Sequence, residues 1–238
     1  MGVIRVGLSG YSYPDWQGEG LFYPPSLPKV QYLKFYSSRY PTVEGVGMFV
    51  SMPAESTTAK VINQCPPTFH LSPKMHQNVT HRKRLKPESL PIVEEFLGPL
   101  HGLEEKGMLG PVLLQLPPNF RIKLDVLEAF LNGIPRRSTL RWAIEFRNAS
   151  WQVTETENLL ENFGVSWVAD DTDEADAKIH STANHLYVRL RKTNYSEDQL
   201  AEYAKLLKAD GRDAHVYVRH TDVEAPWRWA DQFVELTS

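Results

Sequence analysis

Short runs of apolar and β-branched residues recur along the chain, and most are followed by a stretch whose apolar residues have helical spacing. Gly, Pro, Asn or Asp bounds each run, as expected for strands that end in turns. This alternation indicates an α/β fold with a parallel sheet and crossover helices. The count of eight predicted strands indicates a single (β/α)8 TIM-type barrel over residues 1–238. The predicted strands are Ile4–Leu8, Thr42–Val46, Thr68–Leu71, Val112–Leu116, Trp142–Phe146, Ser166–Ala169, Leu186–Leu190 and His215–Val218.

Several helix ends carry recognisable signals. A Ser or Thr followed three residues later by Glu or Gln predicts a capping box, which satisfies amide hydrogens that lack partners inside the helix. Glycine tolerates the left-handed conformation that ends many helices, and proline suits a first helical turn. The segment 171–185 is polar and lacks apolar periodicity, so we expect a loop there. The predicted boundary residues are Thr154 with Glu157, Ser196 with Gln199, Gly164, Gly211 and Pro226.

Composition limits the functional classes. Of the 238 residues, 42% are hydrophobic and 23% are charged, as in ordinary globular proteins. The net charge of -3 excludes a globally basic nucleic-acid binder but leaves room for a local basic patch. Cys65 is the only cysteine, so no intramolecular disulfide can form, and no apolar run is long enough to cross a membrane. We therefore expect a cytoplasmic protein without a membrane partner.

The chemistry is expected at the strand ends. In a barrel of this type the carboxyl ends of all strands open onto one face, so side chains that are distant in the sequence converge there. The candidate residues on this face are Tyr13 and Trp16 after strand 1, Glu44 in strand 2, Lys74 and His81 after strand 3, Gln115 in strand 4, Glu145 and Arg147 at the end of strand 5, Asp170 after strand 6, Arg189 and Arg191 at strand 7, and Arg219, His220 and Asp222 after strand 8.

These segments resemble a known family, the YecE-like proteins, also called domain of unknown function 72. The resemblance covers most of the chain and implies the barrel fold. It implies no particular reaction, because the family has no established activity. The matching pieces are Ser9-Gly10-Tyr11-Ser12-Tyr13 with Trp16, Phe22-Tyr23-Pro24, Thr42-Val43-Glu44, Lys74 with Thr80-His81, Gln115-Leu116-Pro117-Pro118, Glu145-Phe146-Arg147 with Ser150-Trp151, and Tyr187-Val188-Arg189.

The chain departs from the family pattern at three places. Members commonly have His-Gly where this chain has Arg191-Lys192, and an Asn pair where it has His220-Thr221. After Glu44, the usual Asn and a following Phe-Tyr are replaced within residues 45–50. Any chemistry shared by the family could therefore be altered or lost in this chain.

Glu145 and Arg147 lie two residues apart on one predicted strand, so their side chains face the same side. One interpretation is a buried ion pair that tightens the barrel. The other makes Arg147 an anion clamp, because guanidinium offers a planar set of donors suited to phosphate or carboxylate. Glu44 would then be a second carboxylate across the barrel, in a general acid/base pair or in part of a metal site.

Lys74 and His81 are the other candidates for proton transfer. A buried, unpaired lysine would cost several kcal/mol, so Lys74 is expected to pair with a carboxylate or to face a ligand. His81 belongs to the Thr80-His81 pair of the family pattern, although a solvated loop histidine is an equally good interpretation. No His-Glu-x-x-His or Cys-x-x-Cys spacing is present, so the sequence supports no metal site and names no cofactor.

The strand-end face is expected to be cationic. The run 81–86 is the densest positive stretch, and Lys74, Arg147 and Arg189 project from the same face. A charge run is usually only a solvated face, but its position after strand 3 favours a binding role. Tyr13 and Trp16 could form a stacking platform for a base or sugar, or could belong to a hydrophobic plug over the first helix.

Two functional hypotheses follow. The first is an enzyme acting on a phosphorylated or nucleic-acid-like anionic substrate, with Arg147, Arg189, Gln115, Tyr13, Trp16 and Asp170 binding it and Glu44, Lys74, Glu145 or His81 transferring protons. The second is a barrel that binds a nucleotide or nucleic acid without turnover. Carboxylates locked in salt bridges would favour binding alone, whereas free carboxylates in an open pocket would favour an enzyme. A sugar-isomerase-like metal enzyme fits least, because histidines are sparse.

Overall fold

A computed structural model describes residues 2–219 and 225–237, which form an α/β fold. Every paired strand is parallel to its neighbour, so the α/β class and the parallel pairing expected from the sequence are confirmed. The strands are β1 Ile4–Leu8, β2 Thr42–Gly45, β3 His70–Pro73, β4 Val112–Gln115, β5 Trp142–Glu145, β6 Ser166–Trp167, β7 Ala169–Asp170, β8 His185–Leu190 and β9 Asp213–Val218.

The strands form a six-stranded sheet of order β3-β2-β1-β9-β8-β7 and a three-stranded sheet of order β4-β5-β6. Two parallel bridges, Leu71 to Leu109 and Lys74 to Leu113, connect the β3 side of the first sheet to the β4 side of the second. On the other side, β6 and β7 are separated only by Val168, whose amide donates to the Ile144 carbonyl at 2.9 Å. Both flanks of the two sheets are therefore joined.

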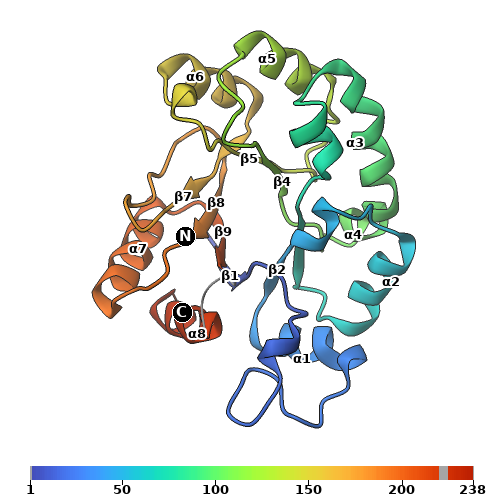
Figure 1. Cartoon of the computed structure of the whole chain (residues 1–238), viewed down its shortest axis with the longest axis vertical. Helices are drawn as coiled ribbons and strands as arrows, with labels where there is room; N and C mark the ends of the chain where they lie inside the picture. Colours follow the sequence, from blue (N-terminus) through green and yellow to red (C-terminus); the bar gives the residue numbers. More distant parts are fainter. Residues whose placement is uncertain (1, 220–224, 238) are drawn as a thin grey trace.

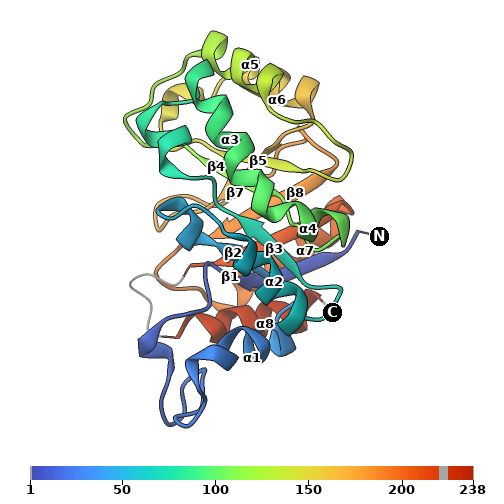
Figure 2. The same ribbon diagram turned by 90° about the vertical axis from the view of Figure 1, so that its right-hand side faces the viewer.

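The helices stand around the outside of the strands (Figure 1), and the strands run between them through the middle of the molecule (Figure 2). The α-helices are α1 Tyr32–Arg39, α2 Glu55–Gln64, α3 Leu90–Leu97, α4 His101–Glu105, α5 Leu124–Gly133, α6 Thr154–Phe163, α7 Glu197–Asp210 and α8 Pro226–Thr237. Short helical turns are η1 Pro14–Trp16, η2 Lys29–Gln31, η3 Val46–Phe49, η4 Asn78–Arg82, η5 Pro87–Ser89, η6 Gly98–Leu100 and η7 Ala149–Trp151.

The strands have two buried faces of different character. On β8, Leu186, Val188 and Leu190 belong to the large core that packs against the helices, while Tyr187 and Arg189 point to the other side. That other side holds a small apolar cluster formed by Leu113, Ala143, Val168, Tyr187 and Tyr217. Alternation along each strand therefore sends polar and ionisable side chains inward, where they can meet across the sheet.

Most predicted strand bounds were wrong by one or two residues, and the predicted strand Ser166–Ala169 is two short strands, β6 and β7, divided at Val168. Strand β3 begins at His70 rather than Thr68, because the Phe69 amide closes a turn on the Pro66 carbonyl at 2.9 Å and delays the extended segment. The capping box at Thr154 does not form: Thr154 is the first residue of α6, and the cap position is Val153, which makes no side-chain cap. A Ser or Thr three residues before Glu is a weak signal when the helix starts one residue early.

The other boundary signals were confirmed. Ser196 and Gln199 form a reciprocal capping box at the start of α7. Gly164 and Gly211 end α6 and α7 with φ angles of 64° and 78°. Pro226 opens α8, and the residues between β7 and β8 contain no helix. Within the described part of the chain, no helix combines the length and the apolar character needed to cross a bilayer.

Candidate functional site

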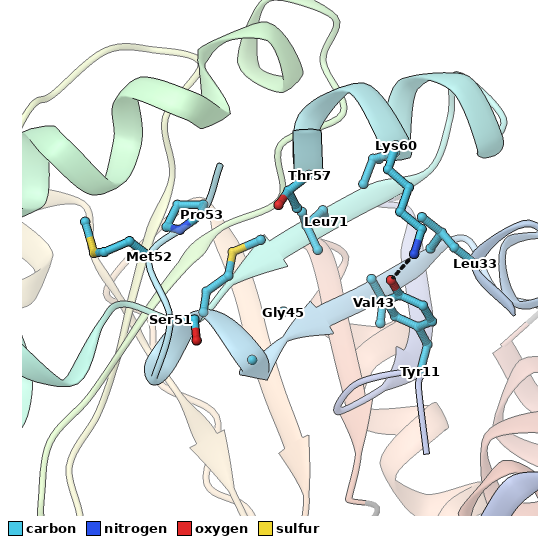
Figure 3. Close-up of a pocket in the computed structure, with 13 residues that line it drawn as sticks. Tyr11, Leu33, Val43, Gly45, Ser51, Met52, Pro53, Thr57, Lys60 and Leu71 are labelled. Atoms are coloured by element: carbon cyan, nitrogen blue, oxygen red, sulfur yellow. Dashed lines mark hydrogen bonds between the residues drawn. The ribbon is translucent and has the colours of Figure 1, made fainter. Parts of the chain in front are cut away.

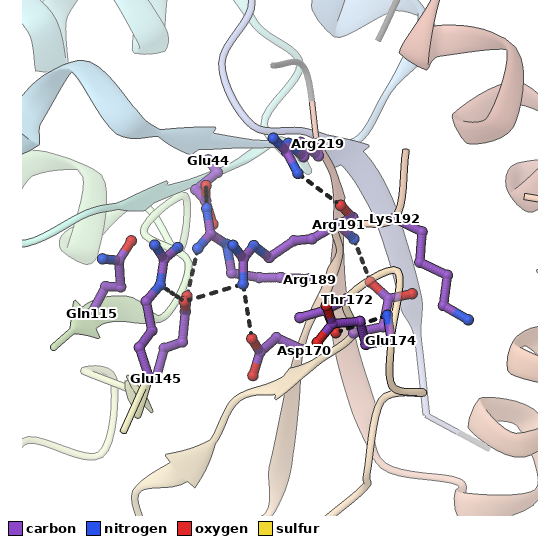
Figure 4. A network of polar contacts seen from close by, with 12 residues as sticks. Glu44, Gln115, Glu145, Asp170, Thr172, Glu174, Arg189, Arg191, Lys192 and Arg219 are labelled. Atoms are coloured by element: carbon purple, nitrogen blue, oxygen red, sulfur yellow. Dashed lines mark hydrogen bonds and ion pairs between the residues drawn. The ribbon is translucent and has the colours of Figure 1, made fainter. Parts of the chain in front are cut away.

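A cavity of about 350 Å³ opens at the carboxyl ends of the strands. It combines residues from strands β4 and β8 with residues from the turns that follow the strands. Figure 4 shows how several of these side chains converge from different elements. The lining residues are Ser9, Val46, Phe49, Lys74, His81, Gln115, Arg147, Arg189, Arg191 and Arg219. None of these described lining residues is a carboxylate.

Arg189 stands at the centre of the polar network behind the cavity wall (Figure 4). Its Nη1 donates to Glu145 Oε2 at 2.5 Å, and its Nη2 donates to Glu44 Oε2 at 3.0 Å. The Tyr187 hydroxyl donates to the remaining Glu44 oxygen at 2.8 Å. Both glutamates are fully buried, so each carboxylate depends on these donors in place of water.

The arginines keep the buried Glu145 ionised. Burial alone would raise the pKa of Glu145, but the charges of Arg189, Arg147 and Arg191 outweigh it and lower the pKa to about 2. Burial likewise opposes the charge of Arg189, while Glu145 and Glu44 hold its pKa above the usual value. Glu44 and Glu145 are therefore engaged in salt bridges, which leaves little capacity for proton transfer.

Two further arginines surround this centre. Arg147 donates through Nε to Glu145 Oε1 at 2.6 Å, and its terminal nitrogens have no hydrogen-bond partner among the described residues. Arg191 donates to Asp170 Oδ2 at 3.0 Å and lies 3.9 Å from Glu145 Oε1. Burial and the neighbouring Glu145 charge raise the pKa of Asp170 to about 6. The expected Glu145–Arg147 ion pair is thus present, with one nitrogen of Arg147 used.

Lys74 lines the cavity beside Gln115. Its ammonium donates to Gln115 Oε1 at 2.7 Å and lies 4.3 Å from the centre of the Phe49 ring. It forms no ion pair with a described carboxylate within 4.0 Å. Burial and the charge of Arg189 lower the pKa of Lys74 to about 8. Lysine has three donors, so the amide of Gln115 leaves donor capacity for a ligand.

His81 completes this part of the lining from η4. Its Nδ1 lies 2.9 Å from Thr80 Oγ1, and its ring meets the edge of Phe49 with 4.8 Å between centroids. Burial and the charges of Lys74 and Arg147 lower the pKa of His81 below its usual value. His81 is therefore neutral near pH 7, and a neutral imidazole can accept a proton.

The cavity carries an excess of positive charge among the described residues. Its lining contains five cations; with Arg219 left out of the balance, the other four are opposed by three carboxylates, which leaves one positive charge. The cations are Lys74, Arg147, Arg189, Arg191 and Arg219; the carboxylates are Glu44, Glu145 and Asp170. The low-dielectric walls strengthen the field of this excess charge in the cavity.

Two predicted groups lie away from this cavity. Trp16 is 4% exposed and packs edge-on against Phe22 and Trp227, as in the hydrophobic plug interpretation. Tyr13 lines a neighbouring cavity of about 330 Å³ together with Glu44. Of the basic run 81–86, only His81 lines the 350 Å³ cavity. Arg82, Lys83 and Lys86 are exposed, and Arg84 donates to Asn119 Oδ1 at 3.2 Å, so these charges do not line the cavity with the strand-end arginines.

Sequence reasoning missed Phe49. This residue, and not Trp16, provides the aromatic ring that lines the cationic cavity. Phe49 ends η3, directly after β2, and touches both Lys74 and His81. An aromatic residue just past the end of a predicted strand was the available signal. Tyr187 was also missed as the partner of Glu44, although its position two residues before Arg189 places both on one strand face.

The family departures fall at the cavity. Arg191 adds a cation to its wall, whereas Lys192 points away and pairs with Asp176 at 2.6 Å. The replaced segment after Glu44 supplies the lining residues Val46 and Phe49. His220, Thr221 and Asp222 lie outside the described residues. Within residues 2–219 and 225–237, no three His, Cys, Asp or Glu side chains cluster as a metal site would require.

Comparisons with known proteins agree on the family. The model of "Protein of unknown function DUF72" matches residues 5–238. The UPF0759 protein YunF of Bacillus subtilis is 30% identical over 157 residues, which is 63% of this chain and 52% of that protein. The match thus spans about half the length of that curated relative.

Solved structures with the same fold include two from this family. A DUF72 family protein from Thermotoga maritima superimposes with a TM-score of 0.76 at 24% identity, covering 98% of each chain. A DUF72 family protein from Enterococcus faecalis gives a TM-score of 0.78 at 17% identity, covering 99% of this chain and 95% of that one. At these identities the similarity establishes the fold alone.

Proposed function

The chain belongs to the DUF72 family of proteins of unknown function, and from that premise we propose that it is a single (β/α)8 barrel that binds a phosphorylated or nucleic-acid-like anionic ligand at its strand ends. Joined sheet flanks and a surrounding layer of helices support the barrel. One observation carries the ligand class: the cavity is lined by five cations, while the carboxylates lie behind them in salt bridges.

The geometry of the cavity suggests a separate role for each of its charged residues. Glu44 and Glu145 hold Arg189 in place rather than exchanging protons. Arg147 offers its two terminal nitrogens, and a guanidinium fork suits two oxygens of one phosphate. Lys74 and Gln115 lie beside Arg147 in the lining, because Gln115 pairs in register with Glu145 on the neighbouring strand, and both supply further donors to the anion. A phosphate bound among these donors would offset the excess positive charge.

The binding test compares matched arginine variants. Inorganic phosphate and a short single-stranded oligonucleotide are titrated by calorimetry into the wild type, Arg147→Met and Arg136→Met, at low and high ionic strength. Arg136 is an exposed arginine between α5 and β5, away from the cavity. Loss of a charged hydrogen bond is expected to weaken binding by about tenfold or more in Arg147→Met, while Arg136→Met binds like the wild type.

Salt dependence separates the two ligand types. Phosphate binding should weaken through screening, and oligonucleotide binding should fall linearly in a log–log plot because bound counterions are released. Absence of phosphate and oligonucleotide binding to the wild type at low salt would show that the cations are structural. Equal losses in Arg147→Met and Arg136→Met would place the anion elsewhere.

Turnover at the same cavity is the second candidate. It is favoured by Lys74 and His81, which face the cavity, carry lowered pKa values and pair with no described carboxylate. Either group could then transfer a proton during phosphoester cleavage. Release of inorganic phosphate from a panel of phosphomonoesters tests this role. Activity that disappears in both Lys74→Met and His81→Gln supports an enzyme, and phosphate binding without any turnover supports the binding function alone.

A further inference from the structure

Beside the cationic cavity lies a second cavity of different chemistry. It has a volume of about 250 Å³ and lies between α2 and strands β2 and β3 (Figure 3). Its apolar wall consists of Leu33, Val43, Met48, Met52, Pro53, Val61 and Leu71. The lining contains no carboxylate, and its one cation, Lys60, donates to the Tyr11 hydroxyl at 3.1 Å. This cavity suits an uncharged apolar group.

A third cavity, the middle cavity, borders both of them. This space of about 330 Å³ shares Tyr11, Gly45 and Gly47 with the apolar cavity. It shares Val46 with the cationic cavity. A Cβ placed on Gly47 would meet no atom within 4 Å, so open space surrounds this position. The cationic, middle and apolar cavities therefore lie side by side, in that order, along the turn that follows β2.

We propose that the ligand is a phosphomonoester with an apolar arm: the phosphate occupies the cationic cavity, and the arm passes Gly47 into the apolar cavity. This inference rests on the proposed function and adds the substrate class. Among the described residues, the lining of the middle cavity contains no cation, and its one charged residue, Glu44, is already paired with Arg189, so nothing there would compensate a second anionic group and the part of the ligand that crosses it is uncharged. The two methionines of the apolar wall adapt to an alkyl chain or a ring.

The test uses a series of monoalkyl phosphates, from methyl to octyl, titrated below their aggregation concentrations together with inorganic phosphate. Each methylene that enters the apolar cavity is expected to tighten binding roughly fourfold. Affinity should stop rising once the cavity is full, because further carbons remain in water. Phosphate binding combined with a flat alkyl series would overturn this inference while leaving the proposed function intact. Absence of binding by inorganic phosphate, by every alkyl phosphate and by the oligonucleotide would instead remove the proposed function itself.

A substitution at Gly47 tests the route. Gly47→Leu adds a side chain at the shared wall without a steric clash at Cβ, and Gly47 does not line the cationic cavity. It should abolish the dependence on chain length and leave inorganic phosphate binding unchanged. Gly98→Leu is the matched control, because Gly98 is exposed, has a φ of -48° and also has open space around its Cβ. Full chain-length dependence in Gly47→Leu would overturn the proposed route.

A lipid surface presents the same chemistry as these probes. Phosphatidylcholine vesicles containing phosphatidic acid therefore form the second arm of the experiment. We commit to a free small molecule, so octyl phosphate should bind in solution and the protein should remain unbound to the vesicles. Binding to the vesicles without binding to octyl phosphate would overturn that assignment.

Discussion

At the amino ends of the strands, His70, His185 and His215 are buried near Arg141, whereas at the carboxyl ends Glu44 and Glu145 are buried against arginines. Burial and nearby arginine charges lower the pKa of His70 and His185 to about 4, so these histidines are neutral near pH 7. The carboxyl end instead keeps its groups charged and compensates them in pairs.

The two ends of the strands differ in how they accommodate buried ionisable groups, and the difference is what a structural role at the amino ends and a binding role at the carboxyl ends would produce. A neutral histidine needs only hydrogen bonds, and His70 and His215 satisfy part of that need with each other at 2.9 Å. Charged groups cost much more to bury, and a fold that needed only stability could avoid them. The carboxyl end retains an excess of cations around a cavity, and in (β/α)8 barrels, the fold proposed for this chain, this is the end that holds the binding sites.

The largest expected effect comes from removing the guanidinium of Arg189, which tests whether the buried carboxylates at the carboxyl ends depend on ion pairs. Arg189→Met would leave Glu44 and Glu145 buried without their shared donor, so we expect a loss of about 3–5 kcal/mol in the free energy of unfolding. Urea denaturation at pH 7 measures this loss. Arg136→Met, at an exposed position, should change stability by less than about 0.5 kcal/mol. A loss below about 1 kcal/mol in Arg189→Met would show that water enters and solvates the two carboxylates.

Sequence reasoning located the strand-end residues because strand alternation and parallel pairing are local patterns with a simple spatial consequence. Glu44, Gln115, Glu145 and Arg189 lie on four strands, and their convergence follows from the strand count. Sequence reasoning could not predict which of these side chains form ion pairs with one another. Arg189 bridges Glu44 and Glu145, while Lys74 pairs with neither, and that choice depends on side-chain packing across the sheets.

The aromatic residues show the second limit. Trp16 and Phe49 both follow strands, and neither propensity nor spacing distinguishes a buried ring from one that lines a cavity. Trp16 is buried because Phe22 from the same segment and Trp227 from α8, at the other end of the chain, cover it. Phe49 lines the cavity because η3 turns it toward Lys74. Only the tertiary structure decides between the two outcomes.

As the pH falls, the buried histidines at the amino ends of the strands should lower the free energy of unfolding before the buried glutamates at the carboxyl ends do. The pKa of His185 is 6.5 when unfolded and about 4 when folded, so the unfolded chain binds a proton first as the pH falls through this window. His185 therefore lowers the free energy of unfolding progressively between pH 6.5 and pH 4, by a total on the order of 3 kcal/mol. Glu145, with values of 4.5 and about 2, begins to cost stability only below pH 4.5.

The measurement is the change in unfolding free energy between pH 7 and pH 4.5 in the wild type and in His185→Gln. The difference between the two proteins isolates the histidine, because other groups contribute equally. This matters because Asp170 has the opposite sign: its raised pKa of about 6 adds stability as the pH falls. His185→Gln should lose less stability than the wild type. Equal losses would place the acid-sensitive group elsewhere.

The smallest expected effect concerns Lys74, whose charge is part of the cationic excess. Because its pKa is lowered to about 8, the ammonium becomes neutral as the pH rises from 7 to 9, and the cavity loses one positive charge. Sulfate is a suitable probe, since its own charge does not change in this range. We expect sulfate binding to weaken a few-fold between pH 7 and 9 in the wild type. Lys74→Met should bind sulfate weakly and with little dependence on pH, because the titrating group is gone. An unchanged pH profile in Lys74→Met would show that another group controls binding.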